Sequence, residues 1–256
     1  MFVVIKKSRL IIAIIILIAI IGITVGACVG VKTAKTAINA TERKIPVYSV
    51  DTVEKKIALS FDAAWGSDKT LQILDILDRY NVKATFFLVG FWVDEYPDLV
   101  KEIHDRGHQI GNHSENHLHA NTLNNEELKK EIISVNDKVT ALIGETPTCF
   151  RAPFGEYNNE MLTIVEENEM IGVQWSVDSL DWKGLTGGEI ADRVLNKVIN
   201  GDIILCHNNS EHILDALPLI LIGIKNKNYD CVRIDELVMY DNYTIDNNGK
   251  QHQKIN

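Results

Sequence analysis

The chain alternates short apolar runs with longer amphipathic stretches from about residue 56 to residue 234. Apolar residues that stand together over a few positions are typical of strands buried on both faces, so each run predicts a β-strand. The predicted strands cover 57–61, 84–89, 108–111, 148–151, 171–176, 202–205 and 231–234. The stretches between them have helical spacing, which predicts helices over 70–80, 97–106, 124–143, 158–168, 187–200 and 213–226.

Local signals support two of these helices. Leu71, Leu74 and Leu77 would form one apolar stripe along the first helix. Asn124 and Glu127 have the spacing of a capping box, in which each side chain bonds the backbone of the other residue. We therefore expect the long helix to begin directly after Asn124.

Alternating strands and helices predict an α/β fold with parallel strands and helices outside them. An open doubly wound sheet and a closed barrel both fit this alternation. Five polar residues stand at or just after the ends of five different predicted strands: Asp62, His113, Arg151, Asp178 and His207. A parallel barrel gathers such residues at one face, so we predict a distorted (β/α) barrel of about seven parallel strands.

The N-terminal part of the chain predicts a membrane anchor. Residues 10–31 carry no charge over 22 positions, which is long enough to cross a bilayer core of ~30 Å. Lys6, Lys7 and Arg9 precede this span and place the N-terminus in the cytoplasm and the domain outside. The expected organisation is a cytoplasmic stretch 1–9, a transmembrane helix 10–31, a linker 32–50, a catalytic domain 51–240 and a mobile polar tail 241–256.

Two alternatives for the N-terminus stay open. Residues 25–28 loosely resemble a lipoprotein cleavage site with Cys28 as the lipidated residue, and Gly26 and Ala27 suit ordinary signal cleavage. The other cysteines are at 149, 206 and 231, with no Cys-x-x-Cys pattern, which argues against a zinc–thiolate site. We expect buried free thiols, although a disulfide among these three is compatible with the sequence.

Composition narrows the class of partner. Hydrophobic residues make up 46% of the 256 residues, which allows a sizeable core. The formal net charge is −9, and basic residues do not gather in a stripe beyond the N-terminus. Because phosphate neutralisation needs clustered Lys and Arg, we expect no nucleic-acid partner.

The polar residues at the strand ends have the chemistry of a metal-assisted hydrolase. His113 and His117 are four positions apart, so both imidazoles can face one ion from a helical turn or a tight loop. Asp62 is a single acid at a strand end, and His207 is a further histidine with acids nearby in the predicted fold. An ion, a base and an acid are what hydrolysis of an amide requires.

Five segments carry these residues, and their order and spacing resemble a known family. They read Ser-Phe-Asp at 60–62, His-Ser-Glu-Asn-His at 113–117, Arg-Ala-Pro-Phe-Gly at 151–155, Asp-Ser-Leu-Asp-Trp at 178–182 and Leu-Cys-His at 205–207. The chain resembles the polysaccharide deacetylases of the NodB-homology kind, carbohydrate esterase family 4, over about residues 50–240. Phe-Asp-Ala-Ala-Trp-Gly at 61–66 is similar to the first motif of the sporulation-associated branch.

The resemblance implies a role for each motif residue in N-deacetylation of a glycan. Asp62 would be the base, Arg151 would hold it ionised, His207 would be the general acid, and Asp181 would orient His207. The same resemblance assigns His113 and His117 to a divalent metal, with zinc expected, and Asp178 to support of the site. The expected substrate-binding residues are Pro153, Phe154, Trp182 and Leu205. We expect a monomeric catalytic domain.

One position departs from the family pattern. Most members have a second aspartate after Asp62 as the third metal ligand, and this chain has Ala63 there. Asp62 or Asp68 could replace the missing ligand, or the metal could bind weakly. Three functions follow: a metal-dependent deacetylase of N-acetylated amino sugars in cell-wall or spore-cortex glycan, a non-catalytic glycan-binding or scaffolding protein on the same fold, or a hydrolase of another C–N bond.

Overall fold

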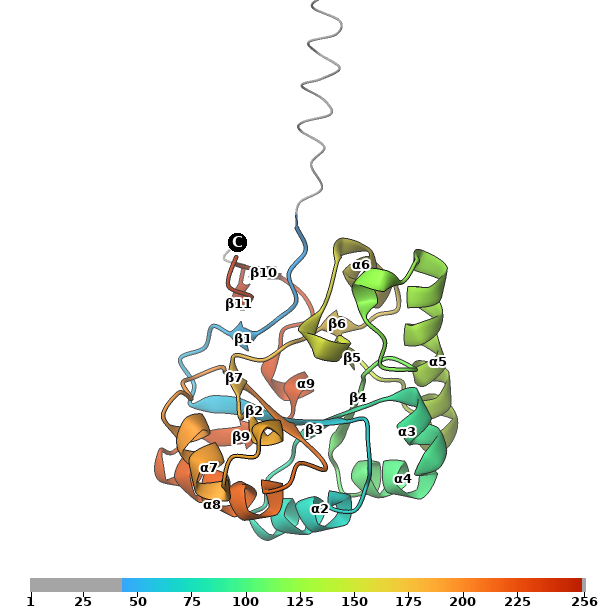
Figure 1. Cartoon of the computed structure of the whole chain (residues 1–256). Helices are drawn as coiled ribbons and strands as arrows, with labels where there is room; N and C mark the ends of the chain where they lie inside the picture. The colour runs from blue at the N-terminus through green and yellow to red at the C-terminus, as the bar shows by residue number, and fades with distance from the viewer. Residues whose placement is uncertain (1–42, 255–256) are drawn as a thin grey trace, which may run out of the picture. The chain divides into compact units, whose positions relative to one another are not determined.

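The computed structural model describes residues 43–254 (Figure 1). The predicted cytoplasmic stretch, the transmembrane helix and Cys28 therefore lie outside the described residues. Within residues 43–254, no helix combines the length and the apolar character needed to cross a membrane.

A curved sheet of parallel strands forms the centre of the fold. Its strands run in the order β6-β5-β4-β3-β2-β8-β7, and a further strand, β9, pairs with the start of β2. Every pairing in this sheet is parallel, as predicted. The strands are β2 (Lys56–Ala63), β3 (Thr85–Leu88), β4 (Gln109–Asn112), β5 (Cys149–Phe150), β6 (Ile171–Gly172), β7 (Val177–Asp178), β8 (Ile203–His207) and β9 (Asp230–Val232).

Helices cover the outside of this sheet (Figure 1). They are α2 (Thr70–Arg79), α3 (Gly90–Glu95), α4 (Pro97–Asp105), α5 (Asn125–Ile143), α6 (Asn159–Glu167), α7 (Gly187–Leu195), α8 (Ile213–Asn226) and α9 (Ile234–Leu237). The capping box of α5 is confirmed, since Asn124 Oδ1 accepts from Glu127 N–H and Glu127 Oε2 accepts from Asn124 N–H. In α2, however, Leu71 is 46% exposed, and the buried face is formed around Leu74 and Leu77 instead.

Alternation along β2 decides which residues can do chemistry. Ile57, Leu59 and Phe61 pack into the core between sheet and helices. Ser60 and Asp62 lie on the opposite face of the strand, because successive side chains alternate. Asp62 is thus placed inside the curve of the sheet, near the C-terminal end of its strand.

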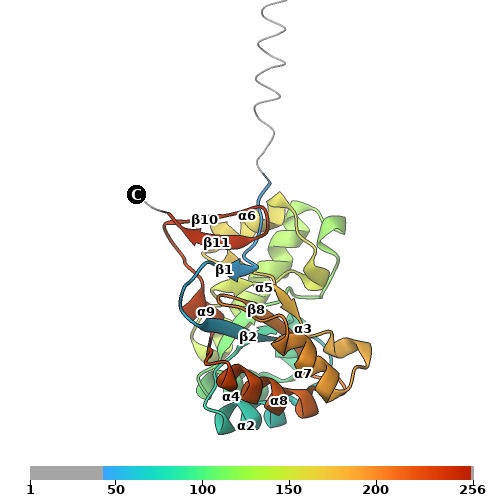
Figure 2. The same cartoon turned by 90° about the vertical axis from the view of Figure 1, so that its left-hand side faces the viewer.

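The predictions of a linker over 32–50 and a mobile tail over 241–256 are wrong for the part of each segment that the structure describes. Val47 is fully buried, its N–H donates to Gly172 O of β6, and its carbonyl accepts from Gln174 N–H. Strand β1 (Ser49–Val50) pairs with β11 (Lys250–Gln253), which pairs with β10 (Tyr243–Ile245). Figure 2 shows β1, β10 and β11 together, across the molecule from α2 and α8. The reason is that β6 and β7 do not pair, which leaves the edge of β6 open for residues 46–50 to cover.

Candidate active site

A cavity of about 690 Å³ lies at the C-terminal ends of the parallel strands. Most of the residues predicted from the sequence line it: Asp62, His113, His117, Phe154, Asp178, Trp182, Leu205 and His207. The remaining ones, Arg151, Asp181 and Pro153, are buried behind the lining. The prediction that residues at several strand ends converge on one site is therefore confirmed.

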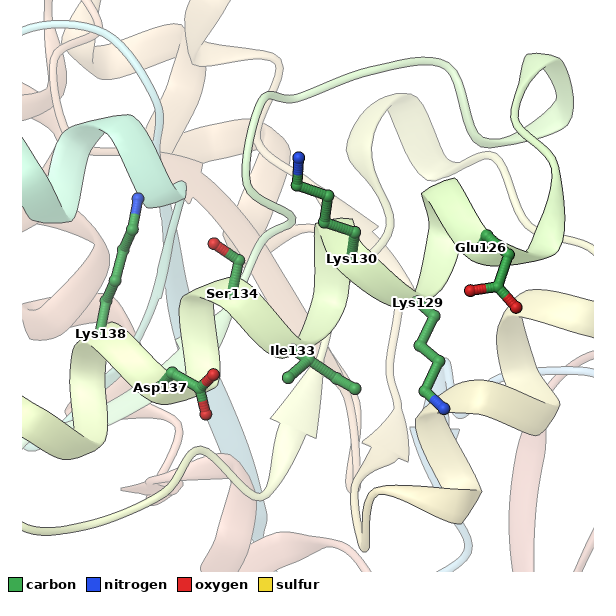
Figure 3. A pocket seen from close by; sticks show the side chains of 7 residues that line it. All are labelled: Glu126, Lys129, Lys130, Ile133, Ser134, Asp137 and Lys138. Atoms are coloured by element: carbon green, nitrogen blue, oxygen red, sulfur yellow. The ribbon is translucent and has the colours of Figure 1, made fainter.

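A second, more open hollow of about 480 Å³ lies on one helix and has a different character. All seven of its lining residues come from α5, as Figure 3 shows: Glu126, Lys129, Lys130, Ile133, Ser134, Asp137 and Lys138. Lys138 is already held by ion pairs to Asp94 and Glu115. This hollow holds no histidine and no paired acid and base, so the chemistry belongs to the first cavity.

Asp62 and Arg151 form a buried ion pair. One guanidinium nitrogen of Arg151 donates to Asp62 Oδ1 at 2.6 Å, and the other donates to Ser60 Oγ at 2.9 Å and Gln174 O at 3.2 Å. Arg151 therefore bonds only one oxygen of Asp62, and Asp62 Oδ2 faces His113 Nε2 at 3.5 Å. Burial alone would raise the pKa of Asp62, but the charge of Arg151, with smaller effects of the nearby histidines, holds it below its usual value.

His113 and His117 face each other from the loop that follows β4, with ring centroids 5.0 Å apart. His113 Nδ1 donates to Arg151 O at 2.8 Å, which fixes the tautomer and leaves Nε2 with a lone pair. Burial lowers the pKa of both imidazoles, to about 4 for His117, so both are neutral near pH 7. His117 Nδ1 is buried and has no hydrogen-bond partner among the described residues.

Helix α5 holds this loop in an unusual conformation. Ser114 and His117 have φ values of 70° and 54°, which non-glycine residues adopt at a cost. Glu131 of α5 accepts from Ser114 Oγ, from the Asn116 N–H and from Asn116 Nδ2 at 2.6–2.8 Å. These charge-assisted bonds offset the strain and keep both imidazoles directed to the cavity.

The donor set fits a divalent ion only in part. Two neutral imidazoles with an orphaned ring nitrogen are suitable ligands. Within residues 43–254, no group of three or more candidate ligands surrounds a common point. Ala63 is fully buried and offers no donor, and Asp68 is exposed and does not line the cavity, so the prediction that Asp68 reaches in is not supported. His113 and His117 would hold the ion, and Asp62 Oδ2 lies 3.5 Å from His113 Nε2.

His207 lies at the end of β8 and is bound by Asp181. Asp181 Oδ1 accepts from His207 Nδ1 at 2.7 Å, and its Oδ2 accepts from the His207 N–H and from Ser210 Oγ. Burial would lower the pKa of His207, but the hydrogen bond and charge of Asp181 raise it above its usual value. The imidazole is thus disposed to carry a proton, with Nε2 as its remaining nitrogen.

Aromatic side chains form the walls of the cavity. Phe154 packs its ring against His117 at 4.6 Å and stacks on His119 at 4.1 Å, and Trp182 follows Asp181 on the short helix η3 (Asp181–Lys183). Pro153 is buried and does not line the cavity; it begins the turn that places Phe154. Asp178 Oδ1 accepts from the Leu180 N–H, which supports the turn that leads into η3 and Trp182.

Seven lining residues were not predicted as site residues from the sequence: Ala64, Trp65, Ala152, Trp175, Asn208, Asn209 and Ser210. Trp65 lies inside the motif at 61–66, and residues 208–210 directly follow the motif at 205–207, so their place in the sequence is the signal that could have found them. Trp175 gave none, because it lies in a stretch that reads as a strand.

The comparisons with known proteins agree with this site. A family model described as polysaccharide deacetylase matches residues 49–173. The chain is 36% identical to a peptidoglycan-N-acetylglucosamine deacetylase of Bacillus cereus over 197 residues, which cover 75% of this chain and 71% of that protein. The chain therefore belongs to the polysaccharide deacetylase family, a class of hydrolases that act on carbon–nitrogen bonds.

Solved structures show two kinds of relative. Peptidoglycan deacetylase PdaC from Bacillus subtilis superimposes with a TM-score of 0.67 at 34% identity, over 73% of this chain and 92% of that one. A family 4 carbohydrate esterase pseudoenzyme from Bacillus anthracis has a TM-score of 0.73 at 30% identity, over 83% of this chain and 73% of that one. A mutant of that pseudoenzyme has restored enzymatic activity.

Some curated relatives are longer than the matched region. The chain spans 60% of the uncharacterized protein YlxY of Bacillus subtilis. It spans 46% of the peptidoglycan-N-acetylglucosamine deacetylase PgdA of Listeria monocytogenes.

Proposed function

We propose that this protein removes acetyl groups from N-acetylated amino sugars of cell-wall glycan, with a divalent metal ion, zinc being the one expected. The observation that carries the proposal is the presence of a prepared base and a prepared acid in one cavity. Asp62 is held ionised by Arg151, and His207 is held ready for a proton by Asp181. A protein that only binds glycan has no evident use for a base and an acid prepared in this way.

The side chains would divide the reaction between them. A bound ion would polarise the acetamide carbonyl and make a water molecule more acidic. Asp62 Oδ2 accepts the proton of the attacking water. His207 Nε2 donates a proton to the nitrogen of the leaving amine, and Trp182 and Leu205 enclose the acetyl methyl group. The products are acetate and a free amino sugar.

Release of acetate from peptidoglycan by the purified protein, supplied with zinc, tests the proposal. His207→Ala should lower the rate by ~10²–10⁴-fold, because the leaving amine loses its proton donor. His104→Ala is the matched control, since His104 lies on α4 and outside the cavity, and its rate should equal that of the wild type. Equal rates for both variants would remove His207 from the mechanism.

Ala63 and the likeness to a pseudoenzyme favour a second candidate, a non-catalytic glycan-binding protein. Ala63→Asp separates the two, because it supplies the carboxylate that the family pattern has at this position. Under the first candidate the wild type already releases acetate, and the substitution tightens zinc binding. Under the second, acetate release begins only in the variant. A wild type and a variant that both bind glycan and release no acetate would rule out the first.

We propose, further, that residues 10–31 anchor the protein in the membrane with the domain outside, where cell-wall glycan is found. The support is the uncharged length of the span and the basic residues before it. Amino-terminal sequencing of protein extracted from membranes should return Met1 or Phe2. A mature chain that begins at Cys28, or directly after Ala27, would refute the anchor.

A further inference from the structure

Trp65 is an exposed aromatic residue that the mechanism above leaves without a role. Ten large apolar side chains within residues 43–254 are exposed, and three of them line the one cavity: Trp65, Phe154 and Trp182. Trp65 is 65% exposed. Exposed aromatic surface that gathers in a concave site marks a place where a ligand binds.

The position of Trp65 separates it from the group that holds the acetyl methyl. Trp182 and Leu205 lie next to Asp181 and His207, where the amide bond would break. Trp65 instead contacts His117, with ring centroids 4.8 Å apart, and lies 6.3 Å from the ring of Phe91. Phe154 contacts the same imidazole. Trp65 and Phe154 therefore form an aromatic border around His117.

The backbone under Trp65 is fixed by hydrogen bonds. Gly66 O accepts from Trp92 Nε1 and from Asn208 Nδ2, both at 2.9 Å. Gly66 has φ +71°, and a Cβ there would lie 2.2 Å from Asn209 Nδ2, so this turn favours glycine. An indole on a rigid turn loses little freedom when it binds a ligand.

The cavity has room for more than an acetamide. Its volume of about 690 Å³ falls in the range of roughly 300–1,000 Å³ that encloses drug-sized ligands. A pyranose ring presents C–H groups on its faces and hydroxyl groups at its rim. The flat face of an indole suits those C–H groups, and its edge tolerates water.

We propose that Trp65 is a positioning and specificity residue: its indole is the surface on which the sugar next to the reacting N-acetyl sugar stacks. The identity of this sugar rests on the proposed function, in which the ligand is an N-acetylated glycan. The proposal does not depend on turnover, since a non-catalytic glycan-binding protein would use the same surface.

The test is calorimetric titration of the full-length protein, in the His207→Ala background so that ligand is not consumed. The probes are the β-1,4-linked tetramer of N-acetylglucosamine and its monomer. Trp65→Ala should weaken tetramer binding about tenfold or more, the size of other ring-stacking contacts. Monomer binding should stay within about twofold, and Trp65→Phe should keep most of the tetramer affinity.

Leu71→Ala is the control, because Leu71 is an exposed apolar residue on α2 outside the cavity, and its affinities should not change. Unchanged tetramer affinity in Trp65→Ala would overturn the proposal, and so would an equal loss for monomer and tetramer, which indicates a distorted site. Tetramer binding without acetate release from the otherwise wild-type protein would refute the proposed catalysis and leave the role of Trp65 standing.

Discussion

Replacement of Arg151 by methionine tests the electrostatic basis of the site most directly. Arg151 is fully buried, and Asp62 is 7% exposed. The variant keeps an apolar side chain of similar length and leaves the Asp62 carboxylate buried without its cation. Removal of one partner of a buried ion pair costs about 3–5 kcal/mol of folding free energy. For a domain of this size each kcal/mol lowers Tm by ~2–4 °C, so Tm should fall by about 6–20 °C.

Urea unfolding of the metal-free protein, followed by circular dichroism, measures this loss. The double variant Arg151→Met/Asp62→Asn should be more stable than the sum of the two single losses predicts, because it leaves no unpaired charge. Arg106→Met is the control, since Arg106 pairs with exposed carboxylates at the surface and should cost about 1 kcal/mol. Strictly additive losses would refute the reasoning.

The pH dependence gives a second check with a definite sign. In the wild type the pKa of Asp62 lies below its usual value. Ionised Asp62 therefore contributes to the folding stability in full above the usual carboxyl pKa, and this contribution is lost as pH falls through the lowered pKa. In Arg151→Met no cation offsets the effect of burial on the Asp62 carboxyl, so the pKa of Asp62 should rise. The variant's loss of unfolding free energy relative to the wild type should therefore shrink as pH is lowered from about 8 to about 5. A deficit that grows over this interval would contradict the explanation.

Two further predictions concern the histidines. Asp181→Asn should shift the alkaline limb of the acetate-release profile to lower pH, because Asp181 raises the pKa of His207 and keeps it protonated at higher pH; an unmoved limb would exclude this role. Zinc at 100 times its Kd should stabilise the wild type by about 2.7 kcal/mol, and His113→Ala should abolish this gain while His104→Ala keeps it. A zinc-dependent rise in Tm that survives in His113→Ala would place the ion elsewhere.

The central fold could be predicted because it is local in sequence. The run at 57–61 and the bounds 213–226 follow from apolar spacing, and the capping box marks the start of α5. The strands at the two ends of the domain could not be predicted in this way. Gln251 is fully buried and bonds the backbone of Met239, yet its polar side chain reads as surface. Backbone pairing between distant segments leaves no periodic signal in side-chain polarity.

The site shows the same division. Asp62 and His207 could be placed because each lies at or near the C-terminal end of a strand and within a family motif. The bonds from Arg151 to Ser60 and from Ser210 to Asp181 join segments that are far apart in the chain or lie in loops, and they depend on the curvature of the finished sheet. Trp65 lies within the motif at 61–66, but its exposure and its contact with His117 are properties of the folded turn.

The pairing of β1 with β11 redefines where the independently stable unit begins and ends. A fragment of residues 51–240 would keep every motif residue but would lose both β1 and β11. The backbone groups of β6 that Val47 now bonds would become an open sheet edge, the kind of surface on which chains aggregate. A recombinant fragment should therefore run from residue 43 to residue 254. Poor solubility of shorter versions would reflect the loss of the β1–β11 pairing rather than a defect in the catalytic cavity.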